Sequence, residues 1–102
     1  MSAYVIVNIA EVRDAGAYAR YRQQVSNGVR NAGGRYLVRG GESSVLEGDW
    51  RPHRVVVVEF PSSHDARAWW SSEDYASLKQ LRQISTRTEM VLVEGVAMED
   101  VP

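Results

Sequence analysis

A chain of 102 residues, 44% hydrophobic and 25% charged, is expected to form a single globular domain over residues 1–102. Its 12 basic and 13 acidic residues are interspersed, so no basic stripe can follow a phosphate backbone, and we expect no nucleic-acid partner. The absence of cysteine excludes disulfides, thiol nucleophiles and cysteine metal sites.

The first predicted element is a strand from Ala3 to Glu11. Its residues are apolar in both phases of the strand alternation, which predicts that both faces of the strand are covered. No basic segment or cleavage signature precedes it, and the apolar run is shorter than the ~20 residues that span a bilayer. We therefore expect no signal peptide, no membrane partner and a cytoplasmic location.

A helix and a hairpin are predicted next. Asp14 suits a helix N-cap and Gly33-Gly34 a helix stop, and between them apolar residues recur at helical spacing: Tyr18, Tyr21, Val25, Val29 and Ala32. Two strands, Arg35 to Glu47 and His53 to Phe60, are expected to pair around the turn-rich residues 48–52.

The C-terminal third is predicted to hold a broken helix and a last strand. Ser62 with Asp65 resembles a capping box, and Ser71-Ser72 is expected to break and recap the helix. The second helical segment, Glu73 to about Ile84, has the apolar stripe Tyr75, Leu78, Leu81 and Ile84. A strand follows from Thr88 to Val96, and the polar tail MEDVP is expected to fray.

The order β-α-β-β-α-β predicts a ferredoxin-like α+β fold, with a four-stranded antiparallel sheet and both helices on one face. Two helices cover only one face of the sheet, yet the first, third and fourth strands are apolar on both. A second copy of the chain is the simplest cover for the other face. We therefore predict a homodimer whose two sheets pack face to face, a dimeric α+β barrel.

Five segments carry a family resemblance: AYVIVNIAEV, DAGAYARYRQQV, GGRYLVRGGE, VLEGDWRPHRVVVVEFPS and ARAWWSSEDYASLKQLRQ. They resemble the bacterial domain-of-unknown-function family numbered 1330, over roughly Ser2 to Val96. The resemblance implies the dimeric α+β barrel superfamily, whose cofactor-independent monooxygenases, haem-degrading enzymes, chlorite dismutases and muconolactone isomerases generally bind ligands between sheet and helices. It implies no particular reaction. Members of the family often carry Asp in place of Asn8 and Tyr in place of Trp70, and both departures remove an ionisable group.

Arg39, the pair Gly40-Gly41 and Glu59 interrupt the hairpin pattern. Folding the hairpin about its turn places Glu59 near Gly41 and Arg39 diagonally across from Glu59. The glycines are predicted to form a β-bulge, with one of them at positive φ. Two interpretations remain open: an Arg–Glu pair that ties down a bend, or a bulge that aims Arg39 at an anionic ligand.

Asn8 is a polar residue in an apolar central strand, and it needs a hydrogen-bond partner. A neighbouring side chain or water would serve. Haem-degrading and monooxygenase members of the superfamily use an asparagine with a tryptophan of the second helix, so the resemblance also implies a pairing of Asn8 with Trp69 or Trp70.

Tyrosines and histidines complete the candidate residues. Tyr18, Tyr21 and Tyr36 are expected in the core with their hydroxyls at a polar rim, or else lining a site for aromatic ligands. His53 and His64 are far apart in the predicted fold and share no metal-binding spacing, so we expect no metal, no haem and no other cofactor.

These residues predict a ligand site in the cleft between sheet and helices. Its candidate residues are Asn8, Tyr21, Tyr36, Arg39, Glu59 and Trp70. The expected ligand is a small anionic or aromatic organic metabolite, bound by a cofactor-independent enzyme or by a non-catalytic accessory dimer. The composition of such a pocket does not separate these two functions.

Overall fold

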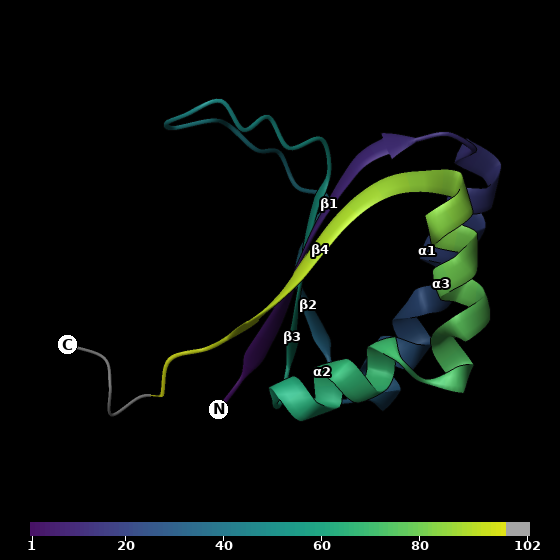
Figure 1. The fold of residues 1–102 in the computed structure, drawn as a ribbon, viewed down its shortest axis with the longest axis vertical. Coiled ribbons are helices and arrows are strands. Elements are labelled where there is room, and N and C mark those ends of the chain that lie inside the picture. Colours follow the sequence, from purple (N-terminus) through teal and green to yellow (C-terminus); the bar gives the residue numbers. More distant parts are fainter. Residues whose placement is uncertain (98–102) are drawn as a thin grey trace.

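The computed structural model describes residues 1–97, so the expected fraying of residues 98–102 lies outside the described part of the chain. Figure 1 shows a sheet with all helices on one side. The elements in chain order are β1 (Ala3–Val12), α1 (Ala15–Asn31), β2 (Arg35–Arg39), β3 (Val55–Phe60), α2 (Ser63–Trp70), α3 (Glu73–Ser85) and β4 (Thr86–Glu94).

The four strands form one antiparallel sheet in the order β2-β3-β1-β4, which confirms the predicted ferredoxin-like topology. β1 is central and pairs along most of its length with both β3 and β4. Val5, Val7 and Ile9 of β1 point into the core beneath the helices. By the alternation of a strand, the residues between them point to the opposite face, which we call the open face.

Side-chain caps set the helix boundaries as predicted. The Asp14 carboxylate accepts a hydrogen bond from the Ala17 amide at 3.0 Å and opens α1, and the hydroxyl of Ser62 accepts one from Asp65 at 3.1 Å and opens α2. Ser72 caps α3 by accepting from the Tyr75 amide at 3.2 Å, so the break at Ser71-Ser72 is confirmed. Each cap satisfies an amide that has no partner within its helix.

The inward face of α3 differs from the predicted stripe. Tyr75 is buried, but Ile84 is 67% exposed, whereas Arg82 and Ser85 are 5% and 1% exposed. Ser85 ends the helix close to α1, where its carbonyl accepts from the Arg13 amide at 2.7 Å. Arg82 lies seven positions after Tyr75, about two helical turns, and so faces inward with it, whereas Ile84 lies nine positions after Tyr75 and points away.

The hairpin between β2 and β3 is shorter than predicted. The prediction of strands over Arg35–Glu47 and His53–Phe60 is wrong between Arg39 and Val55, where residues 40–54 form a projecting segment without strand structure that we call the arm (Figure 1). Gly40 has φ +76°, which ends β2 because a regular strand needs negative φ. Within the arm, glycine, serine and acidic residues supply little apolar surface to pack.

The predicted bulge lies at a different place. The register of β2 against β3 shifts between Tyr36 and Val38, not at Gly40-Gly41. Positive φ is confirmed at Gly40, whereas Gly41 does not have it. The shift puts Arg39 opposite Val56, on the helix side of the sheet.

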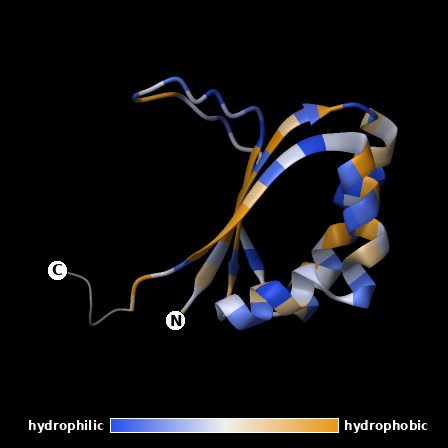
Figure 2. Ribbon diagram, viewed as in Figure 1, coloured by the Kyte–Doolittle hydropathy of each residue, from blue (hydrophilic) through white to orange (hydrophobic). Residues whose placement is uncertain are grey.

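The open face is largely apolar. Figure 2 shows the crossing strands as the most hydrophobic part of the ribbon. Val38 is 38% exposed, Val91 55% and Val93 45% in the single chain. None of the helices within residues 1–97 has the length and apolar character needed to cross a bilayer.

Candidate functional site

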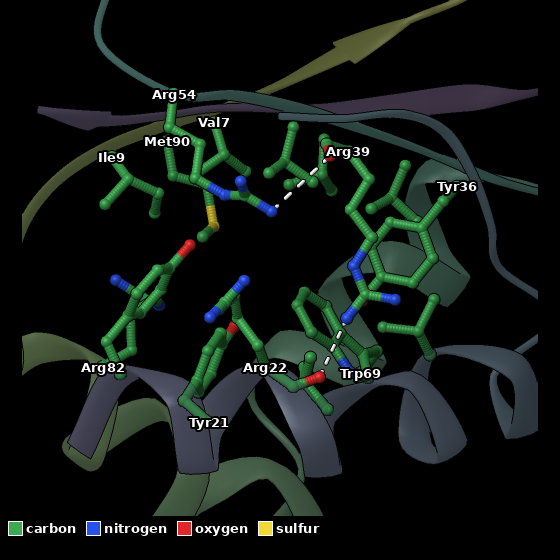
Figure 3. A pocket seen from close by; sticks show the side chains of 16 residues that line it. Val7, Ile9, Tyr21, Arg22, Tyr36, Arg39, Arg54, Trp69, Arg82 and Met90 are labelled. Carbon is green, nitrogen blue, oxygen red and sulfur yellow. Dashed lines mark hydrogen bonds between the residues drawn. The ribbon is translucent and has the colours of Figure 1, made fainter. Parts of the chain in front are cut away.

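A small cavity lies between the sheet and the helices, and we call it the inner cavity. It measures about 40 Å³. Figure 3 shows arginine side chains entering it from both the sheet side and the helix side. Its polar lining residues include Tyr21, Tyr36 and Arg39, as predicted, together with Arg22, Arg54, Trp69 and Arg82.

Arg39 crosses from the sheet to α1. Its two Nη atoms donate to the Ser26 hydroxyl at 2.9 Å and to the Arg22 carbonyl at 2.8 Å. The guanidinium also lies over the Tyr36 ring, 4.3 Å from its centroid. These contacts hold the side chain at the edge of the inner cavity, a position that the register shift in β2 makes possible.

Arg54 and Arg22 approach the cavity from opposite sides (Figure 3). The backbone of Arg54 is fixed at the base of the arm, where its carbonyl accepts from the Ile9 amide at 2.8 Å. The Arg54 Nε is buried and has no hydrogen-bond partner within residues 1–97. Arg22, on α1, lies over the Tyr18 ring at 5.4 Å.

Arg82 is the most deeply buried of these arginines. Its Nε donates to the Tyr75 hydroxyl at 3.3 Å, and that hydroxyl is 2.7 Å from the hydroxyl of Tyr21. Arg82 is 5% exposed. A guanidinium at this depth is ordinarily matched by an acidic side chain, because an uncompensated buried charge is costly.

Among residues 1–97, no acidic side chain forms an ion pair with the cavity arginines. Within residues 1–97 the ion pairs are Glu11 with Arg13 and Arg87, and Arg35 with Glu59. The indole Nε1 of Trp69 is likewise buried without a partner in this part of the chain. The inner cavity is therefore rich in hydrogen-bond donors and poor in acceptors, which favours an occupant that carries negative oxygen atoms.

Burial also keeps the phenols of the cavity protonated. It raises the pKa of Tyr21 far above its ordinary value, and the neighbouring Tyr75 raises it further. Burial likewise raises the pKa of Tyr36, against the opposing charge of Arg39. At neutral pH both hydroxyls are available as donors and neither is a base.

The raised pKa of Tyr21 predicts a loss of stability in alkali. The unfolded chain releases this proton near pH ~10, whereas the folded chain retains it, so the free energy of unfolding should fall as pH rises above ~10. Urea unfolding at pH 8 and pH 11 measures this. Tyr21→Phe should reduce the drop, and an equal drop in both proteins would contradict the assignment.

Asn8 does not reach the inner cavity. It points to the open face, where its Nδ2 donates to Glu89 at 3.2 Å and its Oδ1 accepts from the His53 amide at 3.1 Å. The implied pairing with Trp69 or Trp70 is therefore wrong, because both tryptophans lie on the helix side of the sheet. Asn8 instead has a neighbouring side chain, Glu89, as its partner, and its bond to His53 fixes the end of the arm to β1.

Glu59 is also on the open face, and its predicted partner is wrong. It lies opposite Arg35, not Gly41, and the Arg35 Nε donates to its carboxylate at 2.6 Å. This hydrogen bond holds the pKa of Glu59 below its usual range. The early end of β2 and its shifted register explain the error, since they place Arg39 on the other face.

The two adjacent tryptophans lie in different surroundings. Trp69 is buried 4.2 Å from the Tyr75 ring and 5.5 Å from the Phe60 ring, measured between centroids. Trp70 is 43% exposed and lines a second, larger cavity of about 560 Å³ between α2, α3 and β4, which we call the outer groove. The six candidate residues are thus distributed over three places.

Three residues of the inner cavity were missed from the sequence: Arg22, Arg54 and Arg82. The hydroxyl of Tyr75, which contacts Tyr21 and Arg82 behind the cavity wall, was missed as a polar group. A usable signal existed for Arg82, which follows Tyr75 and Leu78 at helical spacing and so shares their face of the helix. Arg22 directly follows Tyr21 of the α1 stripe but carried no distinct signal. The inward direction of Arg54 depends on the fold of the arm and has no counterpart in the sequence.

The described residues include no group of three or more His, Cys, Asp or Glu side chains arranged to hold a metal ion. The chemistry that the inner cavity supplies comes from guanidinium, phenol and indole donors. Such donors bind and stabilise negative oxygen.

The βαββαβ topology and a single sheet covered by helices on one face define a ferredoxin-like α+β protein. Residues 2–96 match the family described as a domain of unknown function (DUF1330), and the chain belongs to this family. None of the curated proteins matches the sequence.

Solved structures of the same fold agree with this assignment. A protein of unknown function from Rhodopseudomonas palustris is 17% identical, with a TM-score of 0.76 over 94% of this chain and 83% of that one. A dimeric ferredoxin-like protein of unknown function from Jannaschia sp. CCS1 is 14% identical, with a TM-score of 0.64 over 93% and 100%. An antibiotic biosynthesis monooxygenase is 13% identical, with a TM-score of 0.55 over 95% and 100%. At these identities the likeness concerns the fold alone.

Proposed function

We propose that this protein is a homodimer that binds a small organic anion, a carboxylate or enolate, in the inner cavity. The observation that carries the proposal is the set of arginines around one cavity without an acidic partner in the described chain. An anion with several oxygen atoms would supply the acceptors that Arg54 Nε and Trp69 Nε1 lack. It would also offset the mutual repulsion of the guanidinium groups.

The homodimer is supported by the open face. Its apolar residues are left uncovered by the helices, and one solved structure with this fold is described as dimeric. A second sheet packed against this face would bury the exposed valines of β2 and β4. Together with the helices on the other side, it would leave both faces of β1 covered. The inner cavity lies on the helix side and stays separate from such an interface.

Arg39→Ala tests the anion site. Its removal should weaken the binding of acetate, pyruvate and phenylacetate, where these bind the wild-type protein, by roughly 1.5–3 kcal/mol, the range for a hydrogen bond to a charged group. Isothermal titration calorimetry measures the change.

Arg35→Ala is the matched control. Arg35 is in the same strand but pairs with Glu59 on the open face, so its loss should leave anion affinity unchanged. Equal affinities of Arg39→Ala and wild-type protein would overturn the role of Arg39. The absence of binding by every carboxylate would overturn the site itself.

A cofactor-independent reaction at the same cavity is the second candidate function. The hydrogen-bonded Tyr21, Tyr75 and Arg82 favour it, because hydroxyl and guanidinium donors stabilise an enolate as well as a carboxylate. Mass spectrometry of phenylacetate and pyruvate before and after incubation with the protein separates the two functions. A new product indicates an enzyme, and an unchanged acid indicates a binding protein.

A further inference from the structure

The inner cavity is much smaller than the outer groove, and this limits what each can bind. At about 40 Å³ the inner cavity has room for a carboxylate-sized group but not for a whole metabolite. The outer groove, at about 560 Å³, lies within the range of roughly 300–1,000 Å³ that ligand pockets occupy. A metabolite bound at this site therefore needs both spaces.

The two spaces share a wall. Val5, Arg82 and Met90 line both of them. The Arg82 side chain makes a single hydrogen bond within residues 1–97, from Nε to Tyr75, and is paired with no carboxylate there. The remaining donors of Arg82 are thus unused by residues 1–97, in a side chain that borders both cavities.

The outer groove provides a surface for an apolar ring. The indole of Trp70 lines it together with Met90 and Leu92. The Lys79 Nζ lies 3.7 Å from the centroid of this indole and donates to the Trp70 carbonyl at 3.0 Å, so it contacts one face of the ring. Trp70 is 43% exposed, and an aromatic ring that stays accessible in a groove can stack on the ring of a ligand.

We propose that the ligand is an arylalkyl carboxylic acid with its acid group in the inner cavity, against Arg82, and its ring in the outer groove, against Trp70. This rests on the proposed function, because it places the anion of that site. It adds the chemical class of the ligand and its orientation, with the acid group inside and the ring outside. Trp70 is a contact residue for the ring, and Arg82 is the contact for the acid.

Three probes separate the contributions: phenylacetate carries ring and charge, acetate carries the charge alone, and phenylacetamide carries the ring without charge. Calorimetric titration of the wild-type homodimer should show phenylacetate binding at least about tenfold more tightly than either of the others. Similar affinities for phenylacetate and acetate would overturn the contact with the ring.

The indole N–H signals of the 3 tryptophans locate the probe without any substitution. Phenylacetate should shift the signals of Trp69, in the inner cavity, and Trp70, in the outer groove, and leave that of Trp50 unchanged because Trp50 is in the arm. A shift of Trp69 alone would retain the proposed function and overturn the bipartite ligand. If neither signal shifts, both the proposed function and the bipartite ligand are overturned.

Two variants test the contacts separately. Trp70→Ala should weaken phenylacetate by about tenfold and leave acetate unchanged, whereas Arg82→Met should weaken both acids and leave phenylacetamide unchanged. Arg87→Met, which removes an exposed arginine paired with Glu11, is the matched control and should bind all probes as wild type does. Unchanged affinity for phenylacetate in Trp70→Ala would overturn the ring contact, even if Arg82→Met fails to fold.

Discussion

Replacing Gly40 with valine is expected to lower the free energy of unfolding by about 1–3 kcal/mol and to weaken anion binding in the same protein. Gly40 has φ +76°, a backbone conformation that a β-branched residue adopts only with strain. A Cβ at this position would also meet the guanidinium of Arg54. Arg54 would then have to leave its place in the wall of the inner cavity.

Gly41→Val is the control for this substitution. Gly41 has no positive φ, and a Cβ there would meet no atom within 4 Å. Chemical unfolding and calorimetric titration of phenylacetate should give wild-type values for Gly41→Val and reduced values for Gly40→Val. Equal, small effects in the two variants would show that neither the turn at Gly40 nor the position of Arg54 matters to the site.

Lysines on the open face are expected to dissociate the proposed homodimer. The double variant Val38→Lys, Val93→Lys puts two charges on strands at opposite edges of the sheet, at residues that are 38% and 45% exposed in the single chain. The folded monomer tolerates both, but a face-to-face interface would have to bury them. Light scattering should change from twice the chain mass of 11.4 kDa to that mass itself.

Ile84→Lys is the matched control for the interface. Ile84 is 67% exposed on α3, on the helix side of the sheet, so its charge should leave the dimer intact. A wild-type mass of 11.4 kDa, or a dimer that survives lysines at Val38 and Val93, would show that the two sheets do not pack face to face.

The sequence by itself determined the elements and their order. Asp14, Ser62 and Ser72 are capping residues whose short side chains reach an amide three positions away, so their effect is local and legible in the chain. The apolar residues of β1 likewise predicted a strand, and the βαββαβ order predicted the sheet topology in which it is central. The family resemblance over Ser2 to Val96 agrees with the match over residues 2–96.

Only the tertiary structure decided which residues share a site. The register shift between Tyr36 and Val38 turned Arg39 toward the helices and left Glu59 with Arg35 on the other face. A shift of one residue reverses the face of every later side chain in a strand, and the pattern of β2 is too short to reveal it.

The arm and the end of α3 depend on the tertiary structure for the same reason. Arg54 enters the inner cavity because Gly40 turns the chain and the base of the arm is fixed to β1. Arg82 shares a helix face with Tyr75 by spacing, but only the packing of that face against α1 and the sheet buries its guanidinium. Local spacing decides which helix face an arginine shares, whereas its burial depends on partners that are distant in the chain.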